Sequence, residues 1–365
     1  MMITEVTSAR RCAWSAGHID MKSLLESAHV AICACTYRRP AGLAALLEAV
    51  ARQRFVRRTP SRLSVVIVDN EGSDEAMRLC DQFRFAAGIP IRYVHEARRG
   101  ISHARNRLLD EVAADCDFIA MIDDDEIPEP DWIEQLLEAQ EHSGADVVEG
   151  RVVPVFAEGA PSWIVQGRYF GWHHDLNDAH APGERVYPEL EEARTNNVLL
   201  KGPAVRTLGF RFDPRFGLSG GGDVVFFRAL HAVGCRIVYA PDARVRDMIP
   251  LERTNLRWLW RRWYRVGANA RFKRPVRREP NPSLKRIVMW KWHGSGAAAL
   301  ATGLAMLMGS LLRGSIDMAH LAPGIKQIAH GLGKAASALG IRYEQYRDDG
   351  TDRSARSHPQ RVTGS

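Results

Sequence analysis

Short apolar runs alternate with longer stretches of helical spacing between residue 30 and about residue 247. Runs of apolar and β-branched residues predict strands, and apolar residues recurring every three or four positions predict helices. The strand-like runs are 30–35, 63–68, 91–94 and 118–122, and the helical stretches are 43–53, 73–85, 103–112 and 130–142. This alternation is typical of an α/β fold with a mostly parallel sheet covered by helices on both faces.

Beyond these elements the pattern loosens. The stretch 161–188 is rich in Trp, His and Pro, and it predicts a long functional loop, because aromatic residues are uncommon in linkers. Order returns at 195–200. A Gly-rich turn at 217–222 then leads into a predicted helix, 223–233, and a last strand, 236–240.

Polar side chains follow the first two predicted strands, at the edge where α/β sheets bind ligands. Thr36, Tyr37 and Arg38 come after the first strand, and Asp69 ends the second. The first three could supply a hydroxyl, a stacking ring and a phosphate-seeking guanidinium, and Asp69 could accept hydrogen bonds from a base or a ribose. Each alone would be an ordinary loop residue, but together they predict a ligand-binding edge.

Three consecutive carboxylates, Asp123, Asp124 and Asp125, close the buried strand 118–122. Carboxylates this close repel one another unless a cation lies among them, and hard oxygen ligands suit Mg²⁺ or Mn²⁺. A solvated turn is the competing interpretation. The buried strand before the triplet favours the metal site, since a solvated turn needs no such strand to position it.

Two further polar positions stand at predicted helix starts. Gly100 precedes a helix that carries Arg105, a side chain able to reach a pyrophosphate. Asp223 follows the glycines of 220–222, where it could take a proton from an attacking hydroxyl. Asp is also a favoured helix N-cap, so both interpretations of Asp223 stay open.

The C-terminal third differs in charge and apolarity. Residues 251–292 hold thirteen Arg and Lys against two acids, a surplus of eleven that exceeds the net charge of +7 for the whole chain. Such a strip predicts an anionic partner, either phospholipid headgroups or a polyphosphate. Gly294–Leu312 contains no charged residue and could associate with a membrane or form part of a buried helix pair.

Six cysteines stand at 12, 33, 35, 80, 116 and 235, without zinc-type spacing or a C-x-x-C motif. This usage is typical of reduced core cysteines in a cytosolic protein. The N-terminus carries Arg10 and Arg11 but no apolar segment after them, so a secretory signal is not predicted.

Six segments in a fixed order resemble the family 2 glycosyltransferases of the GT-A fold, in the style of bacterial exopolysaccharide and succinoglycan glucosyltransferases. They are 34–40, 66–74, 99–107, 118–132, 212–230 and 238–250. The resemblance implies a GT-A domain at 29–250 after an N-terminal extension, 1–28. We expect membrane-associated helices at 251–345 and a disordered tail at 346–365.

The resemblance also implies roles for individual residues. Thr36, Arg38 and Asp69 would contact the uridine of the donor, and Arg105 would lie near its diphosphate or sugar. The expected donor-binding set is Thr36, Tyr37, Arg38, Asp69, Arg105 and Asp124. Asp123 and Asp125 would form the D-x-D metal pair, with Asp125 favoured as the direct ligand, and Asp223 would be the catalytic base.

The chain departs from the family pattern at three places. Gly222 stands where a Glu usually precedes the base, and 236–255 lacks the family's His, for which Asp247 or Arg246 could substitute. Leu259 replaces the Gln of the Q-x-x-R-W motif of processive synthases, which favours transfer of one sugar per acceptor.

The expected reaction is an inverting, metal-dependent transfer from a UDP-sugar, with UDP-glucose as first choice. The acceptor would be a lipid-linked glycan at an anionic membrane surface, on the cytoplasmic face of the inner membrane. A non-catalytic donor-binding or scaffold protein is the alternative raised by Gly222. A nucleotidyltransferase would need a Gly-rich phosphate loop after residue 35, and a nucleic-acid binder would leave the acidic strand end and Asp223 unexplained.

Overall fold

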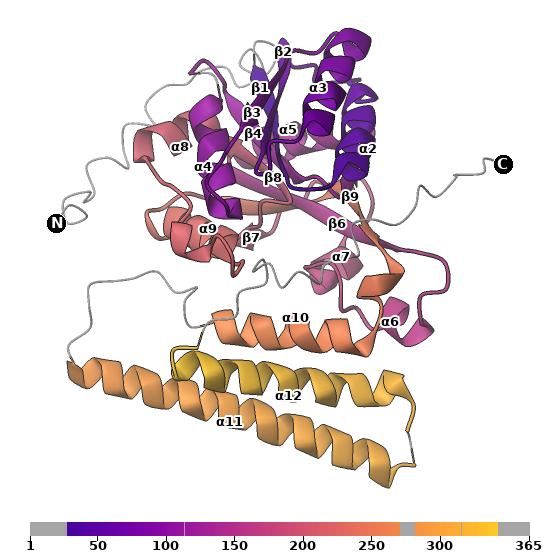
Figure 1. Ribbon diagram of the computed structural model, residues 1–365, viewed down its shortest axis with the longest axis vertical. Helices are drawn as coiled ribbons and strands as arrows, with labels where there is room; N and C mark the ends of the chain where they lie inside the picture. Colours follow the sequence, from indigo (N-terminus) through magenta and orange to yellow (C-terminus); the bar gives the residue numbers. More distant parts are fainter. Residues whose placement is uncertain (1–27, 113, 271–281, 315, 342–365) are drawn as a thin grey trace.

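The computed structural model describes residues 28–112, 114–270, 282–314 and 316–341, with 282–293 by backbone only. The expected N-terminal extension, apart from Ala28, and the expected disordered tail lie outside the described residues. The remainder is an α/β domain above a layer of three long helices (Figure 1). The α/β fold expected from the sequence is confirmed.

A nine-stranded sheet forms the centre of the domain, in the order β3-β2-β1-β4-β8-β6-β9-β5, with β7 paired to β9. Its first half is parallel and is built of β1 (His29–Thr36), β2 (Arg62–Asp69), β3 (Ile91–His95) and β4 (Phe118–Asp123). These are the four strands expected from the apolar runs, and their alternate side chains enter the cores on both faces of the sheet.

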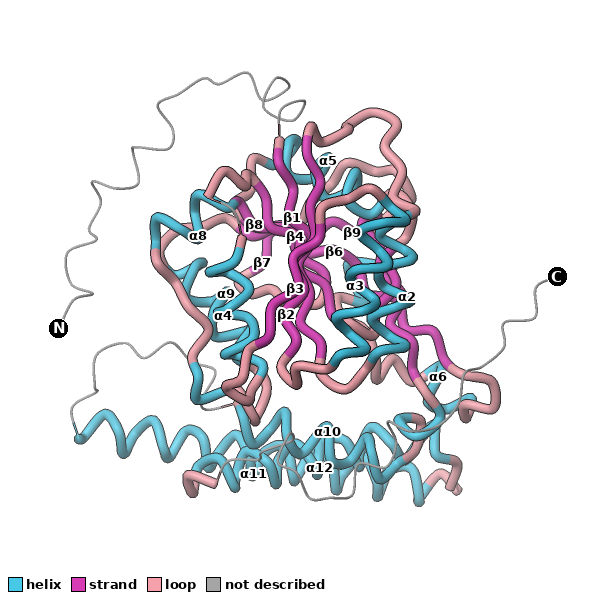
Figure 2. The backbone as a smooth tube through the Cα atoms, turned by 45° about the horizontal axis from the view of Figure 1, so that its top comes forward, coloured by secondary structure: helices cyan, strands magenta, loops and turns pink. Residues whose placement is uncertain are grey.

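Helices cover both faces of this sheet (Figure 2). One core lies beneath α2 (Pro40–Ala51), α3 (Asp74–Ala87) and α5 (Trp132–Ser143). The opposite core lies beneath α4 (Ile101–Glu111), α8 (Gly202–Leu208) and α9 (Gly222–Ala232). The five described cysteines are free, and all except the half-buried Cys35 lie inside these cores.

The second half of the sheet is mixed. It contains β5 (Glu126–Pro128), β6 (Val147–Phe156), β7 (Glu189–Leu190), β8 (Asn197–Lys201) and β9 (Ile237–Ile249). Strand β8 runs antiparallel to β4 and β6, whereas β6 and β9 are parallel. Strand β9 continues nine residues past the expected end at residue 240, because a register shift at Gly150/Arg151 accommodates Pro241.

The aromatic stretch 161–188 contains two short helices, α6 (Ser162–Gln166) and α7 (His174–Ala179). Ile164 and Phe170 join Leu259 and Trp263 in a third core, which connects this stretch to the helical layer. The segment is therefore packed against the remainder of the protein and is not a linker.

Two short 3₁₀ turns, η1 (Pro214–Phe216) and η2 (Leu251–Arg253), precede the helical layer in the sequence, η1 before α9 and η2 directly after β9. The helical layer consists of α10 (Leu256–Asn269), α11 (Pro282–Leu312) and α12 (Met318–Ala338), with α10 nearest the sheet and α12 between α10 and α11 (Figure 1). Among the described helices, α11 alone is long and apolar enough to cross a membrane, over Gly294–Leu312, and 22% of that window is buried.

Candidate active site

The parallel strands bring the predicted polar residues to one edge of the sheet. Thr36 is in register with Asp69 on β2, and Cys35 is in register with Asp123 on β4. The strand ends that the sequence placed at a common edge therefore lie side by side.

The acidic triplet at the end of β4 is held by hydroxyl and guanidinium groups. Thr36 donates its hydroxyl hydrogen to Asp124 at 2.8 Å, and Arg39 donates to Asp124 at 3.1 Å and to Asp125 at 2.8 Å. Arg253 of η2 lies 3.4 Å from Asp125. Burial raises the pKa of Asp124 to about 6, although Arg39 opposes this shift. Asp124 is thus an internal anchor of the triplet, while Asp123 and Asp125 are more exposed.

Asp123 joins the triplet to two other predicted residues. Arg105 of α4 places a guanidinium nitrogen 3.6 Å from the Asp123 carboxylate. Desolvation raises the pKa of Asp123, Arg105 lowers it, and the negative charges of Asp125 and Asp223 raise it. Asp123 therefore interacts electrostatically with both Arg105 and Asp223.

A second layer of carboxylates lies behind the triplet. Glu126 on β5 is opposite Asp247 on β9, and it accepts a 2.8 Å hydrogen bond from the Asn196 amide. Burial, followed by the charge of Asp123, raises the pKa of Glu126 well above its usual range. Burial and then Asp125 raise the pKa of Asp247 to about 6, and Arg253 and Arg262 oppose that shift. Sequence reasoning missed Glu126 and Asn196, although Glu126 directly follows the triplet.

These carboxylates fit a divalent cation that is shared with a ligand. Burial is the first cause of the raised pKa values of Asp124, Glu126 and Asp247, and the charges of neighbouring carboxylates raise them further, so a cation here would meet several poorly solvated carboxyl groups. Within the described residues, no three His, Cys, Asp or Glu side chains converge to form a complete metal cage. A hard cation that takes one or two carboxylates and completes its coordination with phosphate oxygens matches this arrangement.

Asp69 lies at the same edge but is occupied by the protein itself. Its carboxylate accepts hydrogen bonds from the backbone N–H groups of Glu71 and Ser73 at 2.8 and 2.7 Å, and from the Tyr93 hydroxyl at 2.9 Å. It is 1% exposed. Asp69 therefore shapes the β2–α3 loop, and its expected contact with a nucleotide stays a prediction.

Tyr37 and Arg38 form the exposed rim of this edge. The Arg38 guanidinium lies 5.0 Å from the centre of the Tyr37 ring and donates to Glu71 at 2.6 Å. Arg38 has a positive φ of 57°, which turns the chain from β1 toward α2. The two side chains lie beside Thr36, in reach of a ligand at the strand ends.

The start of α4 is fixed by hydrogen bonds that sequence reasoning did not foresee. The Asn70 amide donates to the carbonyls of Glu96 and Arg98 and accepts from the Gly100 N–H, at 2.7 to 2.8 Å. The N–H of Ile101 donates to the carbonyl of Gly217 at 3.1 Å. The helix that carries Arg105 is thereby attached to the loop that leads to Asp223.

Asp223 lies in the first turn of α9, and the N-cap position belongs to Gly221, which has φ 87°. The carboxylate of Asp223 accepts a 2.8 Å bond from the Val224 N–H. A Cβ at Gly222 would lie 3.1 Å from the Cβ of Phe216, so a larger residue would be crowded there. Because Gly221 holds the N-cap position, the N-cap interpretation of Asp223 is excluded. The contact at Gly222 is tight, so a Glu there would require Phe216 to shift.

Helix α10 contacts the loop before Asp223. The amide of Asn269, at the last position of α10, donates to the Ser219 carbonyl at 2.7 Å. Asn269 is 3% exposed. Because Arg253 immediately precedes the same helix, α10 is connected to both the acidic triplet and the Asp223 loop.

An aromatic and arginine cluster borders the site on the side of the 161–188 stretch. The guanidinium of Arg194 lies 4.1 Å from the centre of the Trp172 ring, and that of Arg262 lies 5.6 Å from it. Arg262 also lowers the pKa of Asp247, which connects the cluster electrostatically to the acidic residues. Arginine and tryptophan side chains in this arrangement are suited to contacts with sugars and phosphates.

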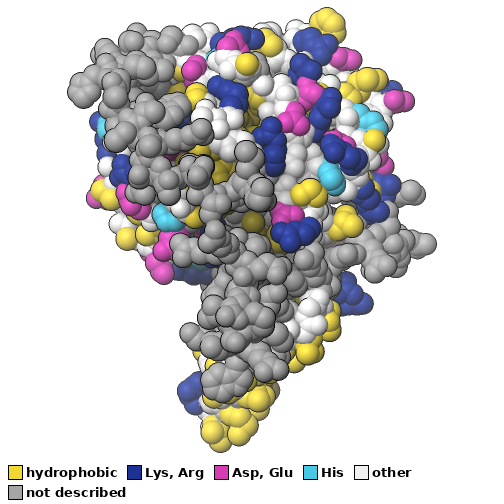
Figure 3. Space-filling view, turned by 90° about the vertical axis from the view of Figure 1, so that its left-hand side faces the viewer, with side chains coloured by type: hydrophobic (Ala, Val, Ile, Leu, Met, Phe, Trp, Pro, Cys, Tyr) yellow, Lys and Arg dark blue, Asp and Glu magenta, His cyan; other side chains and the backbone are white. Residues whose placement is uncertain are grey.

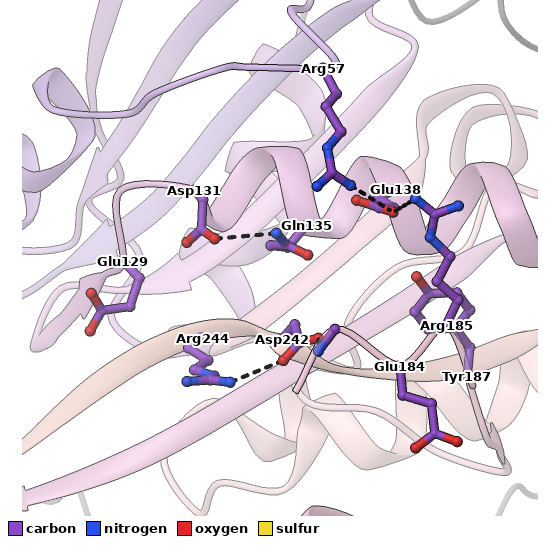
Figure 4. A pocket seen from close by; sticks show the side chains of 11 residues that line it. Arg57, Glu129, Asp131, Gln135, Glu138, Glu184, Arg185, Tyr187, Asp242 and Arg244 are labelled. Carbon is purple, nitrogen blue, oxygen red and sulfur yellow. Dashed lines mark hydrogen bonds and ion pairs between the residues drawn. The ribbon is translucent and has the colours of Figure 1, made fainter. Parts of the chain in front are cut away.

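A separate cleft of about 710 Å³ lies along α5, between β9 and residues 183–187 (Figure 4). Several of its charged side chains pair with one another, as in the contacts of Arg185 with Glu138 at 2.9 Å and of Arg244 with Asp242 at 3.0 Å. None of the site residues predicted from the sequence lines this cleft.

Comparison with known proteins places this geometry in a family context. Residues 31–203 match the family model for "Glycosyl transferase family 2". The succinoglycan biosynthesis protein ExoM of Rhizobium meliloti is 36% identical over 242 residues, which cover 66% of this chain and 74% of that protein. The glucosyl-dolichyl phosphate glucuronosyltransferase of Haloferax volcanii is 29% identical over 251 residues, which cover 66% of this chain and 76% of that protein.

A solved structure shares the fold. The mannosyltransferase PcManGT from Pyrobaculum calidifontis, in complex with GDP-Man and Mn²⁺, aligns with a TM-score of 0.53 at 17% identity. The alignment covers 86% of this chain and 87% of that one. The expected GT-A-like architecture is thus confirmed at the level of the fold.

Proposed function

The chain belongs to glycosyl transferase family 2, and from this premise we propose an inverting, metal-assisted transfer of one sugar from a UDP-sugar, UDP-glucose first. The acceptor is a lipid-linked glycan held at the cytoplasmic face of the plasma membrane, in exopolysaccharide or cell-surface polysaccharide synthesis. The position of Asp123 carries the proposal, because this carboxylate lies 3.6 Å from the Arg105 guanidinium at the edge of the sheet where β1 and β2 also end in Thr36 and Asp69.

The donor binds across the ends of β1, β2 and β4. We assign the nucleoside to Thr36, Tyr37, Arg38 and Asp69, which share one edge of the sheet, and the diphosphate to Arg105, whose guanidinium lies 3.6 Å from Asp123. Asp123 and Asp125 would hold a Mg²⁺ or Mn²⁺ ion, and such an ion would supply positive charge to the departing diphosphate. Asp124, bound to Thr36 and Arg39, keeps the triplet in position.

The transfer uses Asp223 as general base. Its carboxylate accepts the proton of an acceptor hydroxyl while that oxygen attacks the anomeric carbon. The bond between this carbon and the UDP oxygen breaks on the opposite side, and UDP leaves with the electron pair. The configuration of the anomeric carbon is inverted, and no covalent enzyme intermediate forms.

The acceptor approaches from the side of the aromatic and arginine cluster. Trp172 offers a ring to a sugar, and Arg262 offers positive charge between that ring and Asp247. The related succinoglycan and dolichyl phosphate proteins support an acceptor in glycan assembly. The basic strip at 251–292 and the exposed apolar helix α11 support a membrane location.

The test is UDP release from a panel of UDP-sugars, with membrane extract as acceptor, in the presence and absence of Mn²⁺. We expect metal-dependent release with one donor, abolished by Asp125→Ala and by Asp223→Asn. Asp131→Asn, in the separate charged cleft, is the matched control and should release UDP at the wild-type rate. Release that survives Asp223→Asn would assign the base elsewhere, and no release with any donor would favour a non-catalytic scaffold.

A further inference from the structure

The outward side of α11 is a continuous apolar surface. Gly294–Leu312 contains no charged residue, and Leu304, Met306, Met308, Leu311 and Leu312 are 42–83% exposed. In Figure 3 the hydrophobic side chains gather at the lower end of the molecule, which is the end formed by this helix in Figure 1. An apolar surface of this kind marks an interaction site.

The inward side of α11 is a row of small residues packed on α12. Gly296, Gly303 and Ser310, seven residues apart, are its buried positions. A Cβ at Gly303 would lie 2.7 Å from the carbonyl of Gly324, and one at Gly296 would lie 3.3 Å from that of Gly331. Backbones this close leave no room for side chains between the helices, so α11 is held firmly along α12.

Helix α12 is held on α10 in the same way. A Cβ at Gly333 would collide with the backbone of α10, and one at Gly267 would collide with the backbone of α12. Helix α10 in turn contacts the catalytic domain through the Asn269–Ser219 hydrogen bond. The direction of α11 is thus fixed relative to the catalytic domain, roughly along its base (Figure 1).

We propose that the outward side of α11 docks in the plane of an anionic bilayer surface and does not cross the bilayer. A crossing α11 would carry α12 and α10 into the hydrocarbon with it, including Asp317, Lys326 and Lys334, at a large energetic cost. In-plane docking buries the apolar side chains alone. In the sequence, Lys285, Arg286 and Lys291 precede the apolar window within α11 and Arg313 follows it, so positive charges flank the apolar surface at both ends, as anionic headgroups require. This inference rests on the proposed membrane-held acceptor.

The first test measures binding of the full chain to vesicles of phosphatidylglycerol and phosphatidylcholine. Leu304→Lys combined with Met308→Lys should weaken binding at least tenfold, because both side chains would enter the apolar layer as charges. Val56→Lys combined with Phe85→Lys adds the same charge at two other exposed apolar positions, 85% and 86% exposed, and should leave binding unchanged. Equal effects of the two pairs would overturn the proposal.

The second test distinguishes docking from crossing. A fluorophore is attached to Ala297→Cys, Leu304→Cys or Leu312→Cys, and dithionite, which does not cross the membrane, is added outside the vesicles. In-plane docking predicts bleaching at all three positions, whereas a crossing helix protects one end. Absence of vesicle binding together with a dimer in light scattering would assign the surface to a second copy and overturn the proposal.

Donor turnover in the same samples separates this inference from the proposed function. Release of UDP by protein that does not bind vesicles would overturn the docking surface alone. Vesicle binding without UDP release from any donor would overturn the proposed reaction alone.

Discussion

Asp247 is one of the two residues, with Arg246, that the sequence offers in place of the missing family histidine. Its pKa is raised to about 6 by burial and by Asp125, so the folded protein binds a proton there that the unfolded chain releases near pH 4. A carboxyl with a raised folded-state pKa stabilises the fold below its unfolded pKa, and this contribution is lost as pH rises through the folded pKa.

From this linkage we expect the metal-free protein to lose stability between about pH 4 and pH 6 through Asp247. Asp247→Asn should flatten that part of the profile, and Mn²⁺ should raise the melting temperature more at pH 7 than at pH 5. Thermal denaturation across pH, with and without Mn²⁺, measures both effects. A profile identical in Asp247→Asn and wild type would show that Asp247 ionises normally.

Asp69 combines a structural role with a predicted ligand contact. Asp69→Asn replaces one carboxylate oxygen by an N–H₂ group, which cannot accept the hydrogen bonds that the Glu71 and Ser73 N–H groups and the Tyr93 hydroxyl donate. We therefore expect the free energy of unfolding to fall by about 1–3 kcal/mol. Asp74→Asn, at an exposed position of the same region, should cost little. Urea denaturation measures the loss, and donor KM at a temperature where both variants are folded reports the nucleotide contact. An unchanged KM would confine Asp69 to the loop.

Among the helices, α10 connects the helical layer to the loop before Asp223, the proposed catalytic base. Asn269→Ala removes the bond to the Ser219 carbonyl, and we expect kcat to fall about tenfold with donor KM unchanged, since the donor edge is not touched. Asn255→Ala removes the N-cap at the other end of α10 and should cost about 1 kcal/mol of stability without this loss of kcat. Equal kcat in the two variants would show that α10 does not position Asp223.

The elements predicted from the sequence are those whose pattern of apolar and polar residues lies within one short segment. The runs before Thr36, Asp69 and Asp123 end in polar residues, and parallel register alone brings these ends together. The contacts of Asn269 and Arg253 could not be predicted, because they join positions far apart in the chain through an element packed outside the sheet.

The extension of β9 beyond residue 240 has a strand pattern in the sequence, but Pro241 interrupts it. Residues 242–249 alternate buried and exposed positions, with Ala243 and Val245 inside, which is a strand pattern. Pro241 ordinarily ends a strand, and only the register shift on the partner strand β6 lets the pairing resume. Because that shift belongs to β6, the sequence of β9 alone does not reveal it. Asp247 was therefore expected near the site without the strand that places it there.

The whole molecule combines a catalytic edge with a helical layer beneath it. Helices α12 and α10 separate α11 from the sheet (Figure 1), and two helix layers of about 10 Å each set the distance to a docked membrane at about 20 Å. With α11 docked as proposed, a membrane-held acceptor would meet the site at a fixed height. The proposed UDP-sugar donor would reach the same edge from solution, independently of docking.

This separation gives the two substrates different responses to salt. The Debye length falls from about 10 Å at 0.1 M salt to about 3 Å at 1 M, so salt weakens the attraction between anionic lipid and the cationic residues that flank the apolar window of α11, Lys285, Arg286, Lys291 and Arg313. We expect KM for an acceptor in anionic vesicles to rise several-fold between these concentrations, with donor KM nearly constant. Steady-state kinetics with vesicle-bound acceptor measure both constants. A parallel rise in both would place the effect of salt in the catalytic site, and an unchanged acceptor KM would mean that apolar contact alone holds the enzyme on the membrane.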